Sequence, residues 1–216
     1  MQKQNAKPTI ILWDVHEVLF TRNIFHWAYL FVTYPKKWRA IRSLDRHIIR
    51  LCFRYLLHIV RIKRAELSSE ELIAYALQQK KYELAEIAIR IGCDYAPVPG
   101  MVPLIQKLHA RGYTLHIASN LGEAVYETFK TLYPELFCYF SVIQIAYWDG
   151  PRIIKKPNPT FFKQYLEKNN LDPATILFID DKQYNIDAAA QLGIKGIQFR
   201  DAKQLVKELK EHHILI

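Results

Sequence analysis

The sequence predicts an α/β fold, in which a doubly wound parallel sheet is interrupted by one long helical insertion. Short apolar runs with the length of buried strands occur once near the start of the chain and again after residue 97, where they alternate with helical patterns. Residues 21–97 show helical patterns only. Strands that alternate with helices imply parallel pairing through right-handed crossovers. We therefore expect a core domain of residues 1–20 and 98–216 and an inserted helical domain of residues 21–97.

The composition is that of a folded protein with a full hydrophobic core. Half of the 216 residues are hydrophobic, and only seven are glycine. The three cysteines, Cys52, Cys93 and Cys138, are widely spaced without a CxxC pair, which predicts reduced, buried thiols in a cytoplasmic protein. Residues 1–8 are polar and show no secretory signal, and the longest apolar run, residues 24–34, is too short to span a bilayer.

The first strand is expected at residues 10–13 and leads into Asp14. Four consecutive bulky apolar residues predict a strand that is buried on both faces. Such a strand carries the next residue to the carboxyl edge of the sheet, where open α/β sheets bind ligands. Asp14 is therefore placed to attack a substrate or to bind a metal, although a turn or helix-capping aspartate would give the same pattern.

The inserted segment carries the basic excess of the chain. Residues 22–64 contain 11 Lys or Arg and one acidic residue, and the whole chain has a formal charge of +9. Apolar residues spaced three or four apart predict one long helix at 36–64, with basic residues every four positions on its opposite face. This basic ridge consists of Arg42, Arg46, Arg50, Arg54 and His58. It suits an anionic membrane surface or an acidic partner better than a nucleic acid, and a solvated face is the plain alternative.

After the insertion, two further strands end in polar residues. Residues 113–118 lead into Ser119 and Asn120, and residues 175–179 lead into Asp180 and Asp181. The remaining pattern predicts helices at 101–110, 122–132, 158–169, 185–192 and 202–211, and strands at 137–146 and 195–199.

These strand ends predict a cation and phosphate site at one edge of the sheet. Lys156 belongs to the run Lys-Lys-Pro-Asn-Pro, whose prolines fix a turn just before a helix. Carboxylates are the ligands that a hard cation such as Mg²⁺ prefers, and the cation would offset the repulsion between Asp14 and a phosphate dianion. Each signal is weak alone, so the prediction depends on their order along the chain.

That order resembles the four motifs of the haloacid dehalogenase-like (HAD) hydrolase superfamily. The matching residues are Asp14, then Ser119-Asn120, then the run KPNPTFF beginning at Lys156, and then FIDD ending at Asp181 with Asn185 beyond it. The resemblance covers nearly the whole chain and places residues 21–97 at the position of a C1-type cap domain. It implies a Rossmann-like core in which Asp14 is the nucleophile that forms an aspartyl intermediate.

The resemblance also implies roles for the other motif residues. Ser119 would hydrogen-bond the phosphoryl group, with Asn120 beside it at the substrate, and Lys156 would stabilise the charge of the intermediate. Asp181 would bind Mg²⁺ together with Asp14 and the backbone carbonyl of His16, and Asp180 would be a more distant or water-mediated partner of the ion.

His16 departs from the pattern of the family. Phosphatases of the superfamily usually carry a second aspartate at this position, which protonates the leaving group and then activates water; Glu17 follows here where glycine is common. His16 could itself be the acid and base, since imidazole titrates near neutral pH. The step could also proceed without a side chain here, as in some sugar-phosphate phosphatases of the superfamily. The third interpretation is an inactive site in a binding protein.

The sequence as a whole predicts a cytoplasmic, Mg²⁺-dependent phosphatase that acts on a small phosphorylated metabolite. One alternative is a catalytically weak HAD-like protein whose basic cap binds a membrane surface or a macromolecular partner. Another is a metal-independent haloacid dehalogenase, which would also lack the second aspartate, but the Asp180-Asp181 pair argues against it.

Overall fold

The computed structural model describes residues 8–22, 69–80, 82, 85, 88–89 and 95–216. The chain divides into two compact units, one of Met1–Thr21 with Ala96–Ile216 and one of Arg22–Tyr95. The apolar run 24–34, the long helix expected at 36–64 and the basic ridge lie outside the described residues. None of the helices in the described ranges is long and apolar enough to cross a membrane.

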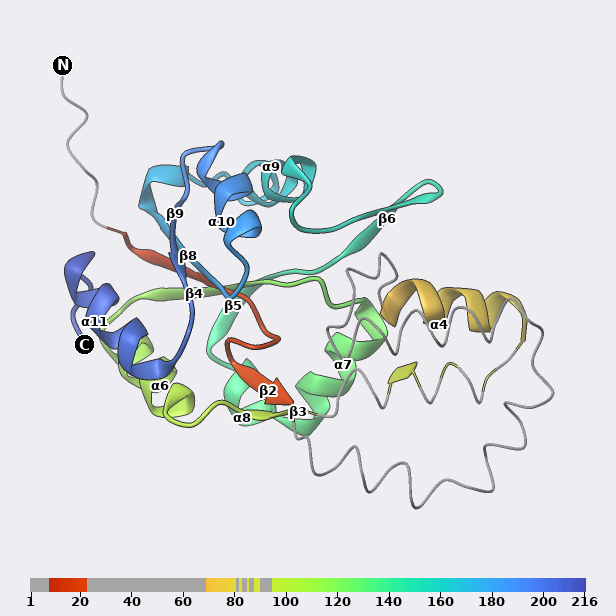
Figure 1. Cartoon of the computed structure of the whole chain (residues 1–216), viewed down its shortest axis with the longest axis horizontal. Helices are drawn as coiled ribbons and strands as arrows, with labels where there is room; N and C mark the ends of the chain where they lie inside the picture. Colours follow the sequence, from red (N-terminus) through yellow and green to blue (C-terminus); the bar gives the residue numbers. More distant parts are fainter. Residues whose placement is uncertain (1–7, 23–68, 81, 83–84, 86–87, 90–94) are drawn as a thin grey trace. The chain divides into compact units, whose positions relative to one another are not determined.

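A five-stranded parallel sheet forms the centre of the first unit, as the sequence predicts. Its strand order is β5-β4-β1-β8-β9, and every neighbouring pair is parallel. From β1 the chain first builds β4 and β5 on one side and then crosses to build β8 and β9 on the other, so the sheet is doubly wound (Figure 1). The strands are β1 (Ile10–Trp13), β4 (Thr114–Ala118), β5 (Phe140–Gln144), β8 (Ile176–Asp180) and β9 (Lys195–Gln198).

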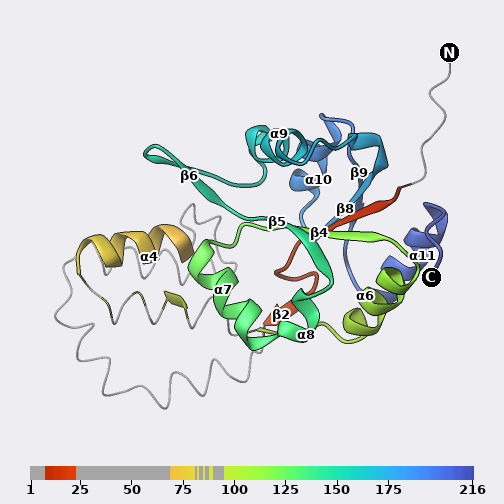
Figure 2. The ribbon, with the colours of Figure 1, turned by 180° about the vertical axis from the view of Figure 1, so that it is seen from behind.

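Helices cover both faces of this sheet. Helices α6 (Met101–Ala110) and α11 (Ala202–Glu211) lie on one face, and α9 (Pro159–Lys168) and α10 (Gln183–Ala190) lie on the other (Figures 1 and 2). Asn158 caps α9 by accepting a hydrogen bond from the backbone of Thr160. Asp201 caps α11 in the same way.

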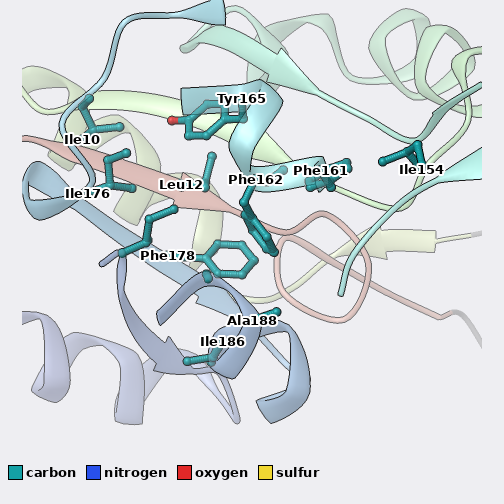
Figure 3. Packing of buried hydrophobic residues seen from close by; sticks show 13 residues of the cluster. Ile10, Leu12, Ile154, Phe161, Phe162, Tyr165, Ile176, Phe178, Ile186 and Ala188 are labelled. Atoms are coloured by element: carbon teal, nitrogen blue, oxygen red, sulfur yellow. The ribbon is translucent and has the colours of Figure 1, made fainter. Parts of the chain in front are cut away.

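One hydrophobic cluster lies on the α9 side of the sheet, and both β1 and β8 contribute to it. Leu12 on β1 and Phe178 on β8 are fully buried and belong to one cluster with Phe162 and Tyr165 of α9 (Figure 3). Because side chains alternate between the faces of a strand, residues two positions further along β1 and β8 point to this same face. Those residues are Asp14 and Asp180.

Several small elements were not predicted from the sequence. The strand expected at 137–146 is shorter, because Pro134 begins the short helix α8 (Pro134–Phe137) before β5 starts. A two-stranded antiparallel hairpin, β6 (Tyr147–Asp149) with β7 (Arg152–Ile154), precedes Lys156. Cys138, expected to be buried, is exposed directly after α8.

The described residues contain a few further elements. They are the two-stranded sheet of β2 (Phe20–Arg22) and β3 (Tyr95–Pro97), the helices α4 (Ser69–Gln78) and α7 (Glu123–Leu132), and a 3₁₀ turn at Pro173–Thr175.

Candidate active site

The register of the sheet brings the motif residues to one place. Trp13 of β1 pairs with Ile179 of β8, so Asp14 and Asp180 follow side by side at the carboxyl edge. On the other side of β1, β4 delivers Ser119 just beyond its last residue. The strand β1 lies where the order of the sheet reverses, and open α/β sheets bind ligands at this point.

Asp14 is buried, and one of its carboxylate oxygens is held by three donors. Oδ1 accepts hydrogen bonds from the backbone N of Val15 at 2.7 Å and from Oγ of Ser119 at 2.8 Å. Nζ of Lys156 lies 3.0 Å from the same oxygen. Among the described residues, Oδ2 has no hydrogen-bond partner. The carboxylate is therefore fixed in orientation, while Oδ2 is available to a substrate or a cation.

Lys156 connects the two aspartates that the strands place side by side. Only 1% of its side chain is exposed, and Nζ lies 2.6 Å from Oδ2 of Asp180 as well as close to Asp14. The ammonium group also lies 5.2 Å from the centroid of the Phe178 ring. A buried cation between two carboxylates offsets the cost of burying both of them.

Asn120 holds the backbone of Lys156 rather than projecting a free amide into the site. Its Nδ2 donates to the carbonyl oxygen of Lys156 at 2.9 Å, and its Oδ1 accepts from the backbone N of Lys156 at 2.7 Å. This reciprocal pair fixes the segment that begins α9. The link was not predicted from the sequence, because it depends on the loop conformation at both residues.

Asp180 and Asp181 differ in how far their oxygens are already occupied. Both oxygens of Asp180 accept hydrogen bonds from Nδ2 of Asn185, at 2.9 and 3.0 Å, and Oδ1 also accepts one from the backbone N of Lys182 at 2.8 Å. Asp181 is less buried, and its Oδ2 forms an ion pair with the ammonium of Lys182. Asp181 therefore has more freedom than Asp180 to accept a further ligand.

The charges at the site shift two pKa values. Burial, together with the negative charges of Asp180 and Asp181, raises the pKa of Asp14 to about 7, although Lys156 acts in the opposite direction. Burial alone would lower the pKa of Lys156, but the adjacent carboxylates of Asp14 and Asp180 outweigh it, so this pKa is raised. Lys156 thus stays charged, and the three carboxylates carry more negative charge than the site neutralises.

His16 lies two residues beyond Asp14 in a tight loop. Its half-buried ring packs edge-on against Phe129, with 5.6 Å between the ring centroids. Glu17 has a φ of 62°, a left-handed conformation that glycine adopts without strain, and its backbone N donates to the carbonyl of Phe20 at 2.6 Å. This conformation gives the physical reason why glycine suits the position.

The residues at this edge fit a hard divalent cation. Asp14, Asp180 and Asp181 each offer a carboxylate oxygen, and these three atoms lie within 4.8 Å of one another. Oδ1 of Asn185, whose Nδ2 contacts Asp180, is buried and has no partner among the described residues, so one oxygen acceptor next to this cluster is unsatisfied. An oxygen-only donor set with excess negative charge suits Mg²⁺ better than a softer metal.

The sequence of the chain also matches the model of a known protein family. The model for haloacid dehalogenase-like hydrolases, a hydrolase family, matches residues 10–193. The chain belongs to the haloacid dehalogenase-like hydrolase family. The match contains all four segments that the structure brings together in this HAD-like hydrolase, from Asp14 to Asp181.

Two curated relatives of this HAD-like hydrolase are named for phosphate compounds or phosphatase activity. A flavin mononucleotide hydrolase of Arabidopsis thaliana is 24% identical over 156 residues, which are 70% of this chain and 60% of the relative. A sesquiterpene phosphatase of Aspergillus oryzae is 24% identical over 120 residues, 56% of this chain and 59% of the relative. In both cases the match spans less than two thirds of the relative's length.

Solved structures show the same fold at low sequence identity. A HAD-superfamily hydrolase of Geobacter sulfurreducens has a TM-score of 0.59 at 14% identity, with 97% of this chain and all of that chain covered. A HAD family enzyme of Bacteroides thetaiotaomicron, in complex with magnesium and inorganic phosphate, has a TM-score of 0.56 at 18% identity, with 90% and 96% covered.

Proposed function

We propose that this HAD-like hydrolase is a Mg²⁺-dependent phosphatase that acts on a small phosphorylated metabolite through an aspartyl-phosphate intermediate. The observation that carries the proposal is the carboxylate of Asp14, of which one oxygen is held by three donors and the other is available to react. The names of two relatives favour a phosphate ester as the substrate class.

In the first step, Oδ2 of Asp14 attacks phosphorus, and the bond from phosphorus to the leaving-group oxygen breaks. Ser119 and Lys156 hold Oδ1, so the attacking carboxylate does not have to be oriented during the reaction. Lys156 also supplies positive charge where negative charge develops on the transferred group. Water then attacks the phosphorus atom, which releases inorganic phosphate and restores Asp14.

The carboxylates of Asp14 and Asp181 would hold Mg²⁺, with the backbone carbonyl of His16 as a further ligand and Asp180 as a more distant partner. When bound, the ion supplies positive charge that offsets the repulsion between the carboxylates and the phosphate. Asp180 is less suited to direct binding, since both of its oxygens already accept hydrogen bonds from Asn185.

His16 is the proposed acid and base of the reaction. It stands at the position where phosphatases of the superfamily usually carry the second aspartate, and general acid–base help contributes about 10²–10⁴-fold. Replacing the imidazole by a carboxylate restores the usual group of the family. We therefore expect His16→Asp to retain activity with an altered pH profile, and His16→Ala to lose much of it.

A phosphatase screen with Mg²⁺ on the wild type, Asp14→Asn and His16→Asp tests the proposal. We expect turnover by the wild type and none by Asp14→Asn. If the wild type and Asp14→Asn are equally inert while His16→Asp gains turnover, the site is inactive as it stands and the chain is a binding protein.

The basic segment favours a second function for the inserted unit. With 11 Lys or Arg and one acidic residue, residues 22–64 could hold a cytoplasmic enzyme at an anionic membrane surface or against an acidic partner protein. We expect the protein to co-sediment at low salt, but not at high salt, with vesicles that contain anionic lipid. We expect no binding to duplex DNA. Salt-independent sedimentation or none at all would contradict it.

A further inference from the structure

Lys182 is a charged residue at the site for which the proposed chemistry has no role. It directly follows Asp180 and Asp181, and its ammonium is paired with Oδ2 of Asp181. Its backbone N separately donates to Oδ1 of Asp180 at 2.8 Å. The backbone of Lys182 therefore holds the loop, and its side chain does something else: it neutralises the carboxylate with the most freedom to bind a cation.

The two lysines at the site differ in how tightly they are held. The side chain of Lys156 is 1% exposed and lies between two carboxylates, at 3.0 and 2.6 Å. The side chain of Lys182 is 39% exposed, and among the described residues its ammonium contacts one carboxylate. A partly exposed ion pair contributes little to stability and opens readily, whereas a buried cation between two anions does not. Lys182 can leave its carboxylate at low cost.

We propose that the side chain of Lys182 is a built-in counterion that competes with Mg²⁺ for Asp181, and that it leaves this carboxylate when the ion binds. The inference rests on the metal site of the proposed function. Three carboxylate oxygens within 4.8 Å of one another need positive charge whether or not an ion is bound. Lys156 and Lys182 supply this positive charge in the absence of the ion, and of the two only the Lys182 side chain can move away from its carboxylate.

The competition weakens the binding of Mg²⁺, because the ion must displace one positive charge before it can use Asp181. Removing that charge while keeping a side chain of similar length should tighten binding by about tenfold, since the carboxylate is then unpaired and no cation repels the ion. Lys182→Met is the variant that does this, and it retains the backbone hydrogen bond to Asp180. Lys182→Arg retains the charge and should bind Mg²⁺ as the wild type does.

Calorimetric titration with Mg²⁺ alone, at low and constant ionic strength, tests the inference without measuring activity. The proteins are the wild type, Lys182→Met, Lys182→Arg and Lys163→Met, a control for net charge that removes an exposed lysine of α9. We expect about tenfold tighter binding in Lys182→Met only. Detectable binding in Lys182→Met with none in the wild type would support the inference as well.

Equal affinity in the wild type and Lys182→Met would overturn the inference and leave the proposed function intact. The absence of Mg²⁺ binding in all four proteins would overturn both. Circular dichroism checks that each variant is folded, with Lys182→Gln as a second variant. If both neutral variants fail to fold, Lys182 is a structural residue and the inference is wrong.

Discussion

Lys156 is the residue on which the charge balance of the site depends most. Its buried ammonium lies between Asp14 and Asp180, so its removal would leave two buried carboxylates without their cation. A buried charge that has lost its partner costs far more than an exposed one. The segment around Lys156 is also held by the amide of Asn120, so the charge is fixed in place.

Lys156→Met should therefore lower the free energy of unfolding by roughly 3–5 kcal/mol at pH 8 without Mg²⁺, because Asp14 and Asp180 are then left unpaired. Urea denaturation measures the loss. The matched variant Lys163→Met, at an exposed position of the nearby α9, should change it by less than about 0.5 kcal/mol. A loss below about 1 kcal/mol in Lys156→Met would contradict the role of the buried ammonium as the counterion of both carboxylates.

At this scale the sequence predicted which residues meet, because residues that follow parallel strands reach one edge of a sheet. It did not predict the bonds of Asn120 to the backbone of Lys156 or the pairing of Lys182 with Asp181. Loop conformation and side-chain rotamers decide these contacts, and hydrophobic periodicity contains no information about either. A lysine next to two aspartates was the available signal.

Among the elements, the packing of α10 against β9 supports the positions of Asn185, on α10, and Asp180, at the end of β8. Gly196 of β9 allows the close approach, because a Cβ atom at this position would lie 2.5 Å from Cγ2 of Ile186 on α10. The contact is too short for two carbon atoms, so the Ile186 side chain, the helix or the strand would have to move.

Gly196→Ala is expected to destabilise the protein by roughly 1–3 kcal/mol through overpacking. Ile186→Ala should also be destabilising, but the double variant should lose less than the sum of the two single losses, because truncation of Ile186 makes room for the new methyl group. Urea denaturation of the wild type, the two single variants and the double variant gives the four free energies of this double-mutant cycle. Additive losses would show that Gly196 does not support the packing of α10.

The longer elements were predictable and the shortest ones were not. Helix α6 begins and ends at the expected residues, and the three central strands lie within a residue of the expected ranges. The hairpin β6–β7 has three residues in each strand, and α8 has four residues in all. Such segments contain too few residues to show a repeated helix or strand pattern, so contacts with the rest of the unit determine them.

At the scale of the whole molecule, one buried histidine should make the stability depend on pH. His116 of β4 is buried, and its Nδ1 lies 2.6 Å from the hydroxyl oxygen of Tyr165. Burial lowers the pKa of His116 from 6.5 to about 4. As the pH falls below about 6.5 the unfolded chain takes up a proton that the folded chain does not, so the folded state loses stability down to about pH 4.

His116→Gln removes this pH-dependent contribution to stability and keeps a polar partner for Tyr165. Between pH 7.5 and pH 4.5 the wild type should therefore lose roughly 2–3 kcal/mol more of its unfolding free energy than the variant loses. Urea titrations at the two pH values give this difference. The exposed His109→Gln is the control and should show no such shift. A difference that is independent of pH would contradict the assignment.

The parallel, doubly wound sheet of the whole molecule was predictable, since alternating buried strands and amphipathic helices have few other solutions. The role of residues 21–97 as a cap remains a prediction, because it depends on how two units work together rather than on a local pattern. In the proposed mechanism the core residues contact the phosphoryl group and, through His16, the leaving-group oxygen, and these atoms are common to all phosphate esters.

The most direct test of the central claim is a chemical trap for the intermediate on Asp14. The wild type is incubated with Mg²⁺ and acetyl phosphate, quenched, and reduced with borohydride, and its peptides are examined by mass spectrometry. We predict that residue 14 is converted to homoserine, and that the conversion requires acetyl phosphate and is absent in Asp14→Asn. Phosphate release with residue 14 unmodified, or with the modification at another residue, would contradict the account.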